Sequence, residues 1–122
     1  MKDFRDLRVW EKAHLLTLDI YKLTTDFPRE ELYGLISQMR RCSVSVAANL
    51  AEGCGKRGSN EFQRYLQIAS GSASELDYHL LLSRDLKFLS QSDYETLVKD
   101  LGELRRMLTS LIVKVDLEQR LA

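Results

Sequence analysis

The residues best able to do chemistry lie in a glycine-rich segment in the middle of the chain, Gly53-Cys54-Gly55-Lys56-Arg57-Gly58. Its glycines match the G-x-G-x-x-G pattern of dinucleotide-binding loops, which follow a β-strand. Helical periodicity precedes this segment, so we interpret it as a loop between two helices. Lys56 and Arg57 would then lie beside the unpaired N–H groups that open the next helix, an arrangement suited to phosphate. A solvated basic loop without a ligand is the simpler alternative.

This loop belongs to the most basic part of a chain whose formal net charge is zero. Residues 36–64 hold five basic and two acidic side chains, which gives them a net charge of +3. Nucleic-acid-binding domains often concentrate such charge on one surface. The residues predicted to contact RNA or DNA are therefore Arg40, Arg41, Lys56, Arg57 and Arg64.

A polar stripe is predicted on the helix that precedes the loop, because polar residues recur there at intervals of three and four. Its members are Gln38, Arg41, Ser45, Asn49 and Glu52. The stripe has few long solubilising side chains, which suits a subunit interface as well as a ligand site. We expect Arg40 or Arg41 to pair with a carboxylate of a neighbouring helix or subunit. The candidate carboxylates are those of Glu52 and Glu75.

Few residues in the sequence have the spacing of a catalytic site. Arg8 and His14 have an R-x5-H spacing that supplies the phosphate-binding arginine and catalytic histidine of some helical ribonucleases. On a helix the two residues lie about 120° apart, and neither has an evident third partner. No Ser/His/Asp or Cys/His arrangement can be assembled. We therefore predict that the chain is not an enzyme, with a ribonuclease as the alternative.

The two cysteines and two histidines do not have metal-site spacing. Cys42 and Cys54 would lie about 18 Å apart along a helix axis, too far for a disulfide, so we expect free thiols. Neither a C-x-x-C nor an H-x-x-x-H pair is present, so no metal and no other cofactor is predicted. His79 is interpreted as a partly buried structural residue. Trp10 and Tyr65 are interpreted as core residues rather than platforms for base stacking.

Four amphipathic segments must position these residues. Apolar side chains recur at helical spacing over residues 7–26, 29–53, 59–89 and 93–119. The predicted fold is all-α, an antiparallel up-down-up-down four-helix bundle forming one domain over residues 1–122. Expected helix starts are an Asp6 N-cap, a first turn at Pro28, a Ser59 N-cap and a capping box from Ser92 to Glu95.

The predicted core residues of the second helix, 29–53, include Leu32, and those of the third helix, 59–89, include Leu86. Gly71 interrupts the third helix within a run of small residues and would cost an isolated helix about 1 kcal/mol. Close approach by another helix is the expected compensation. Gly71 and Glu75 therefore join the polar stripe as predicted interface or polar-network residues.

Nothing in the sequence indicates a membrane protein. No apolar run approaches the roughly 18 to 20 residues that span a bilayer, and the start, Met1 to Asp6, is too charged for a signal peptide. The expected location is the cytoplasm.

Several short motifs occur in an order that is similar to one known family. They are Phe4-Arg5-Asp6-Leu7-x-Val9-Trp10, Ile20-Tyr21, Phe27-Pro28, Tyr33-Gly34-Leu35, Gln38-x-Arg40-Arg41, Asn49-Leu50-Ala51-Glu52-Gly53 and Gly71-Ser72-x-x-Glu75-Leu76. Together they resemble the four-helix bundle proteins encoded by intervening sequences of bacterial 23S ribosomal RNA genes. The resemblance covers nearly the whole chain.

That resemblance implies a ring-shaped homopentamer, and a distant likeness to accessory proteins of diversity-generating retroelements, which bind nucleic acid and reverse transcriptase. Carried over, Arg40, Arg41, Asn49 and Glu52 would be the shared polar stripe, and Lys56 and Arg57 the basic loop. Many relatives have a proline where this chain has Ala47. A proline would kink the second helix, so such a kink is in doubt for this chain.

Two functions remain open. The leading hypothesis is a non-catalytic oligomeric bundle that binds RNA or DNA through phosphate contacts, with strong salt dependence. The alternative is an oligomeric scaffold whose polar stripe and small residues serve only subunit or protein-partner contacts.

Overall fold

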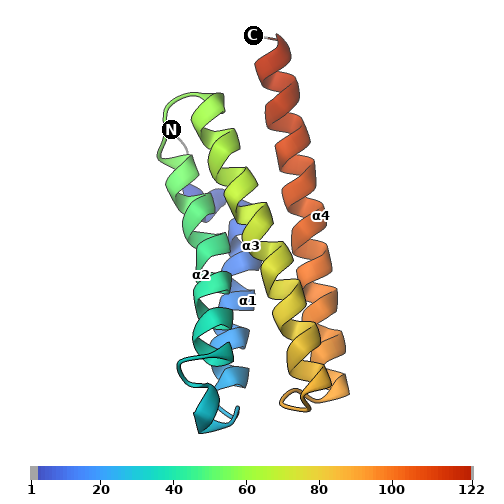
Figure 1. Ribbon diagram of the computed structural model, residues 1–122. Coiled ribbons are helices and arrows are strands. Elements are labelled where there is room, and N and C mark those ends of the chain that lie inside the picture. The colour runs from blue at the N-terminus through green and yellow to red at the C-terminus, as the bar shows by residue number, and fades with distance from the viewer. Residues whose placement is uncertain (1–2, 122) are drawn as a thin grey trace.

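The computed structural model describes residues 3–121, which form four long helices (Figure 1). These are α1 (Arg8–Thr24), α2 (Leu35–Cys54), α3 (Ser59–Asp85) and α4 (Gln91–Leu121). Two 3-10 turns, η1 (Phe4–Asp6) and η2 (Arg29–Glu31), precede α1 and α2. The chain direction alternates from helix to helix, so the predicted all-α antiparallel four-helix bundle is confirmed. The predicted domain ends, 1 and 122, lie outside the described residues.

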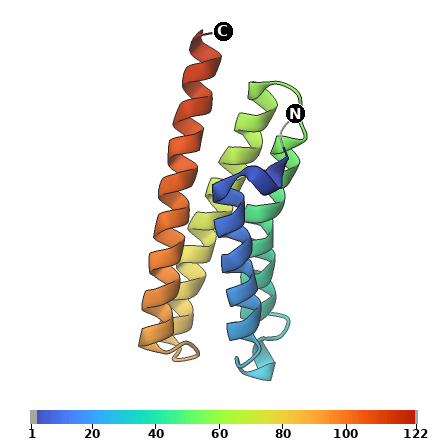
Figure 2. The same cartoon turned by 180° about the vertical axis from the view of Figure 1, so that it is seen from behind.

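Each helix packs on two neighbours. Within residues 3–121, α1 contacts α2 and α4, and α3 contacts the same two helices from the other side. Figure 2 shows α1 lying between α4 and α2. The longest helix, α4, continues past the end of the bundle that carries the α2–α3 loop (Figures 1 and 2). None of the described helices has the length and apolarity required to cross a membrane.

The core follows the predicted apolar stripes of all four helices. Its fully enclosed side chains include Ile20, Met39, Val46, Leu50, Leu66, Leu76, Leu80, Leu97, Leu101, Leu104 and Leu108. Two predictions are wrong: Leu32 is 48% exposed and Leu86 is 47% exposed. Both lie outside the regular helices, because α2 begins only at Leu35 and α3 ends at Asp85. Neither therefore follows the helical periodicity that would have buried it.

The helix starts differ from the predicted caps. Pro28 precedes η2 rather than opening α2, and the Glu31 side chain accepts a hydrogen bond from the Leu35 amide at 3.1 Å. The hydroxyl of Ser90 accepts one from the Asp93 amide at 3.0 Å, so the α4 cap lies two residues before the predicted Ser92. Both side chains satisfy amide donors that the first helical turn leaves unpaired.

The first and third helices also begin differently. Asp6 belongs to η1, and Leu7 is the residue that precedes α1. Ser59 is the first residue of α3 rather than its cap. The preceding residue, Gly58, has a φ of 83°, a left-handed conformation that glycine adopts without steric cost. That conformation reverses the chain between α2 and α3.

The close helix approach occurs at Gly53 and not at Gly71, where it was expected. A methyl group added at Gly53 would lie 2.9 Å from the Tyr65 Cβ and 3.0 Å from the Phe62 ring. One added at Gly71 would meet nothing within 4 Å. The small residues of α3 that face the core are Ala69 and Ala73, which are completely buried. Gly53 therefore sets how closely the ends of α2 and α3 pack.

Candidate functional site

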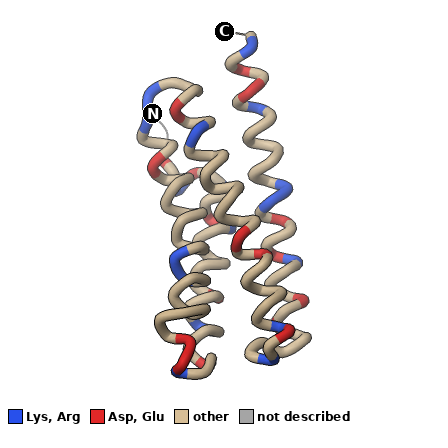
Figure 3. The backbone as a smooth tube through the Cα atoms, in the orientation of Figure 1, with Lys and Arg blue, Asp and Glu red and all other residues tan. Residues whose placement is uncertain are grey.

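Three of the predicted nucleic-acid contacts gather at the α2–α3 end of the bundle. Lys56 lies in the loop with its Nζ 5.6 Å from the centre of the Tyr65 ring, and the Arg64 guanidinium lies 5.0 Å from the same ring. Figure 3 shows basic positions at this loop. Both cations gain from contact with the aromatic face. Tyr65 is half-buried and does not belong to the core cluster of the described residues, so its interpretation as a core residue is wrong.

Arg57 completes this group, which we call the basic end and define as Lys56, Arg57 and Arg64. Arg57 is exposed and has no ion-pair partner within residues 3–121. Arg64 lies 3.7 Å from the carboxylate of Glu61, but both side chains are at least half exposed. Such surface pairs are weak and screened by salt. The basic end therefore offers its charge to solvent.

Arg40 does not belong to this surface. Its Nε donates to the Thr24 hydroxyl at 3.0 Å, and its guanidinium lies 4.7 Å from the centre of the Tyr21 ring. It also donates to the Tyr21 carbonyl oxygen at 3.2 Å. The expected pairing with Glu52 or Glu75 is thus replaced by contacts that join α2 to α1.

Arg41 is exposed but distant from the basic end. Fourteen residues lie between it and Lys56, nearly all of them helical, which corresponds to roughly 20 Å along α2. The five predicted contacts therefore do not form one patch. The five residues belong to one stretch of sequence, but they lie far apart along the length of the helices.

The predicted polar stripe divides into a packed centre and exposed ends. Ser45 shares a hydrogen bond of 2.8 Å with Ser72 of α3, and Asn49 donates to the Ser45 carbonyl oxygen at 2.8 Å. The ends of the stripe, Gln38, Arg41 and Glu52, are exposed. The centre therefore serves contact between α2 and α3 within one chain.

The two residues of the ribonuclease alternative, Arg8 and His14, both lie exposed on α1. The His14 ring stacks on Trp10 with the ring centres 5.0 Å apart and the planes within 7°. No hydrogen bond joins His14 to the exposed Arg8 in the part of the chain that the structure describes. Trp10 itself lies at the edge of the core, where Phe4 packs against its ring at 4.8 Å.

These aromatic residues open onto an apolar groove between α1 and α2. We call it the α1–α2 groove; it is lined by Phe4, Trp10, His14, Thr17, Leu18, Tyr21, Val44, Ala47, Ala48 and Ala51. Leu18 is 52% exposed and Val44 40% exposed. These exposed apolar side chains make the groove a candidate contact surface. Sequence analysis missed it, because core and groove positions both carry apolar residues on these helices.

A second feature that the sequence analysis missed lies between α2 and α3. The Sγ of Cys42 donates a hydrogen bond to the Ser72 carbonyl oxygen at 3.0 Å, and burial with the nearby Glu75 carboxylate raises the pKa of Cys42 to about 12. Glu75 Oε2 lies 3.5 Å from the Nε2 of His79. Burial lowers the pKa of His79, so its imidazole is neutral at pH 7. The spacing of Glu75 and His79 on one helix was the available signal.

The described residues form an all-α bundle of four long helices. Residues 5–110 match the family described as 23S rRNA-intervening sequence protein. The chain belongs to this family, which confirms the resemblance seen in its sequence.

A solved structure supports the same assignment. It is a protein of unknown function from the S23 ribosomal protein family of Bacteroides thetaiotaomicron VPI-5482, with 25% sequence identity and a TM-score of 0.77. The alignment covers 85% of this chain and 94% of that one. A comparison with curated proteins gives no significant match.

Proposed function

We propose that this chain is a non-catalytic, oligomeric bundle that binds RNA or DNA phosphates through its basic end. The observation that carries the proposal is that Lys56 and Arg64 both contact the Tyr65 ring near the start of α3, with the exposed Arg57 next to Lys56 in the loop. Phosphate contacts need cations that solvent reaches and that no strong internal pair neutralises. Arg40 is left out of the proposed surface because its guanidinium is bonded to α1.

Oligomerisation supports this function by repeating a small charge cluster. Three cations on one copy bind a polyanion weakly, whereas a symmetric ring presents several such clusters to the same nucleic acid. The α1–α2 groove is the proposed contact between copies, because it is apolar and open in the single chain. The ring-shaped pentamer implied by the family resemblance is the assembly that we propose.

Charge reversal at the basic end tests the proposal. The variant Lys56→Glu/Arg57→Glu should lower affinity for an oligonucleotide at low salt by about tenfold or more, because phosphate contacts become repulsive. The matched control, Lys22→Glu/Arg29→Glu, makes the same charge change on exposed residues at the other end of the bundle. The proposal fails if both double variants bind as the wild type does, or if both lose affinity equally.

A second candidate, an oligomeric scaffold without nucleic acid, is favoured by the α1–α2 groove together with the net charge of zero. The ratio of nucleic-acid to protein absorbance distinguishes the two. Protein purified at low salt should carry nucleic acid that a high-salt wash removes if the basic end binds phosphate. A scaffold would show no nucleic acid before or after the wash.

A further inference from the structure

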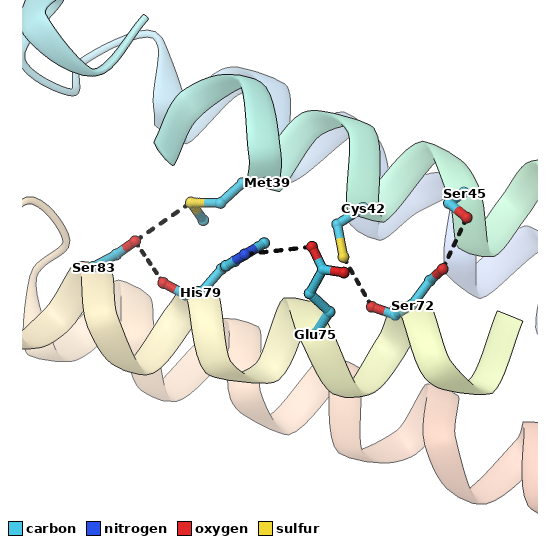
Figure 4. A network of polar contacts seen from close by, with 7 residues as sticks. All are labelled: Met39, Cys42, Ser45, Ser72, Glu75, His79 and Ser83. Atoms are coloured by element: carbon cyan, nitrogen blue, oxygen red, sulfur yellow. Dashed lines mark hydrogen bonds and ion pairs between the residues drawn. The ribbon is translucent and has the colours of Figure 1, made fainter. Parts of the chain in front are cut away.

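Three side chains with different donor atoms converge between α2 and α3 (Figure 4). The Sγ of Cys42, a carboxylate oxygen of Glu75 and a ring nitrogen of His79 all lie within 4.8 Å of one another. We call these residues the thiol–imidazole cluster. Cys42 and His79 are buried, and the Glu75 side chain is 54% exposed. The cluster is therefore enclosed on the core side and open to solvent on the other.

The fold places these residues together for local reasons. Glu75 and His79 are four residues apart on α3, so both project from the same helix face. Cys42 belongs to the core stripe of α2 and approaches the α3 backbone closely enough for its thiol to reach Ser72 O at 3.0 Å. The contact between the two helices thus presents the thiol to the Glu75–His79 pair.

The imidazole of His79 is poorly satisfied for a buried group. Its Nδ1 has no hydrogen-bond partner in the described chain, and its Nε2 reaches only the Glu75 oxygen 3.5 Å away. Buried polar atoms normally have a partner at shorter range. A ligand bound at Nε2, the nitrogen on the side of Glu75, would replace this long contact with a short one.

We propose that Cys42, Glu75 and His79 bind a divalent metal ion of the zinc class. Thiolate, imidazole and carboxylate are the ligands that zinc takes in proteins, at metal–ligand distances of about 2.0 to 2.3 Å. Tetrahedral geometry then requires about 3.4 to 3.8 Å between ligand atoms. The present separations, at most 4.8 Å, need only a small contraction. The Glu75 Oε2–His79 Nε2 separation is already 3.5 Å, and water would fill the fourth position.

Binding requires one proton transfer. The Cys42 thiol loses its proton to solvent as the sulfur–metal bond forms, and its hydrogen bond to the Ser72 carbonyl is lost. A metal ion supplies the charge that deprotonates a coordinating thiol. The neutral imidazole already has a lone pair for the metal. A bound ion would fasten α2 to α3 near the middle of both helices.

Cobalt binding to the full chain tests the site. Metal-free protein is titrated with Co²⁺, and absorption from thiolate-to-cobalt charge transfer is recorded. We expect one Co²⁺ per chain, displaced by Zn²⁺, and no charge-transfer band in Cys42→Ser. The control Cys54→Ser removes the other buried cysteine and should retain the band. Circular dichroism checks that each variant is folded.

Glu75→Gln keeps the test decisive if Cys42→Ser folds poorly, because this exposed side chain can change without disturbing the core. It should weaken cobalt binding by about tenfold or more. The proposal is overturned if wild-type protein shows no charge-transfer band. It is equally overturned if the band survives in Cys42→Ser, or if Glu75→Gln binds cobalt as tightly as the wild type.

Discussion

The guanidinium of Arg40 on α2 donates a hydrogen bond to the hydroxyl of Thr24 on α1, with 3.0 Å between Nε and Oγ1. Thr24 is completely buried and donates in turn to the Ile20 carbonyl oxygen at 2.6 Å. An arginine that the sequence marked as a phosphate contact thus joins two helices. The next residue, Arg41, is exposed, so a substitution there is a control for the same substitution at Arg40.

Arg40→Ala should lower the free energy of unfolding by about 1 to 2 kcal/mol, because it removes the hydrogen bonds to α1 and the contact with the Tyr21 ring. Arg41→Ala should change it by less than about 0.5 kcal/mol. Urea unfolding of both variants measures the difference. Equal effects at the two positions would contradict the structural role of Arg40.

Gly53→Ala and Gly71→Ala should have opposite effects. The first places a methyl group 2.9 Å from the Tyr65 Cβ and should destabilise the fold by about 1 to 3 kcal/mol. The second meets open space within a helix and should stabilise it by roughly 0.5 to 1 kcal/mol. Thermal unfolding midpoints report both. A stabilised Gly53→Ala would show that the helix ends are not closely packed there.

Stability should fall as the pH drops below about 6.5, the ordinary pKa of histidine. Burial lowers the pKa of His79 in the folded chain, so the unfolded chain holds more protons between the two pKa values. The contribution of His79 is therefore complete above about 6.5 and is lost as the pH falls through its folded pKa. Glu75, which faces the ring, opposes the effect only in part.

Urea midpoints at about pH 7.5 and about pH 5.5, recorded with a chelator present, measure this dependence. His79→Leu should flatten it, because it removes the group whose pKa differs between the folded and the unfolded chain. The same slope in wild type and His79→Leu would assign the pH dependence to other groups.

Val44→Glu should dissociate the oligomer that we propose. It places a carboxylate in the α1–α2 groove, where contact with a second copy would bury it without a partner. Val113→Glu is the matched control, since Val113 is 52% exposed on α4 and outside the groove. Mass by analytical ultracentrifugation should fall only for Val44→Glu. An unchanged mass would place the subunit contact elsewhere.

The sequence was sufficient for the fold because each helix carries its apolar residues at helical spacing, as Leu97, Leu101, Leu104 and Leu108 illustrate. Helix ends were less predictable. Ser90 and Ser92 are both suitable by residue type as the N-cap of α4. In the structure it is the Ser90 hydroxyl that accepts the hydrogen bond from the Asp93 amide.

The candidate sites were predicted less completely, because they depend on distances between helices. Periodicity places Glu75 and His79 on one face but does not show that Cys42 lies opposite them. Likewise, it cannot distinguish Arg40, bonded to Thr24, from the exposed Arg41 next to it. Such differences arise from how the helices are rotated against one another.

We propose that this chain forms an oligomer that binds nucleic acid through its basic end. The most direct test is light scattering of the purified protein with and without a mixed pool of RNA and DNA oligonucleotides, at low and at high salt. We predict a multiple of the 14.1 kDa chain mass that gains nucleic-acid mass at low salt and loses it at high salt. An oligomer that never gains mass would contradict nucleic-acid binding and leave the scaffold as the function.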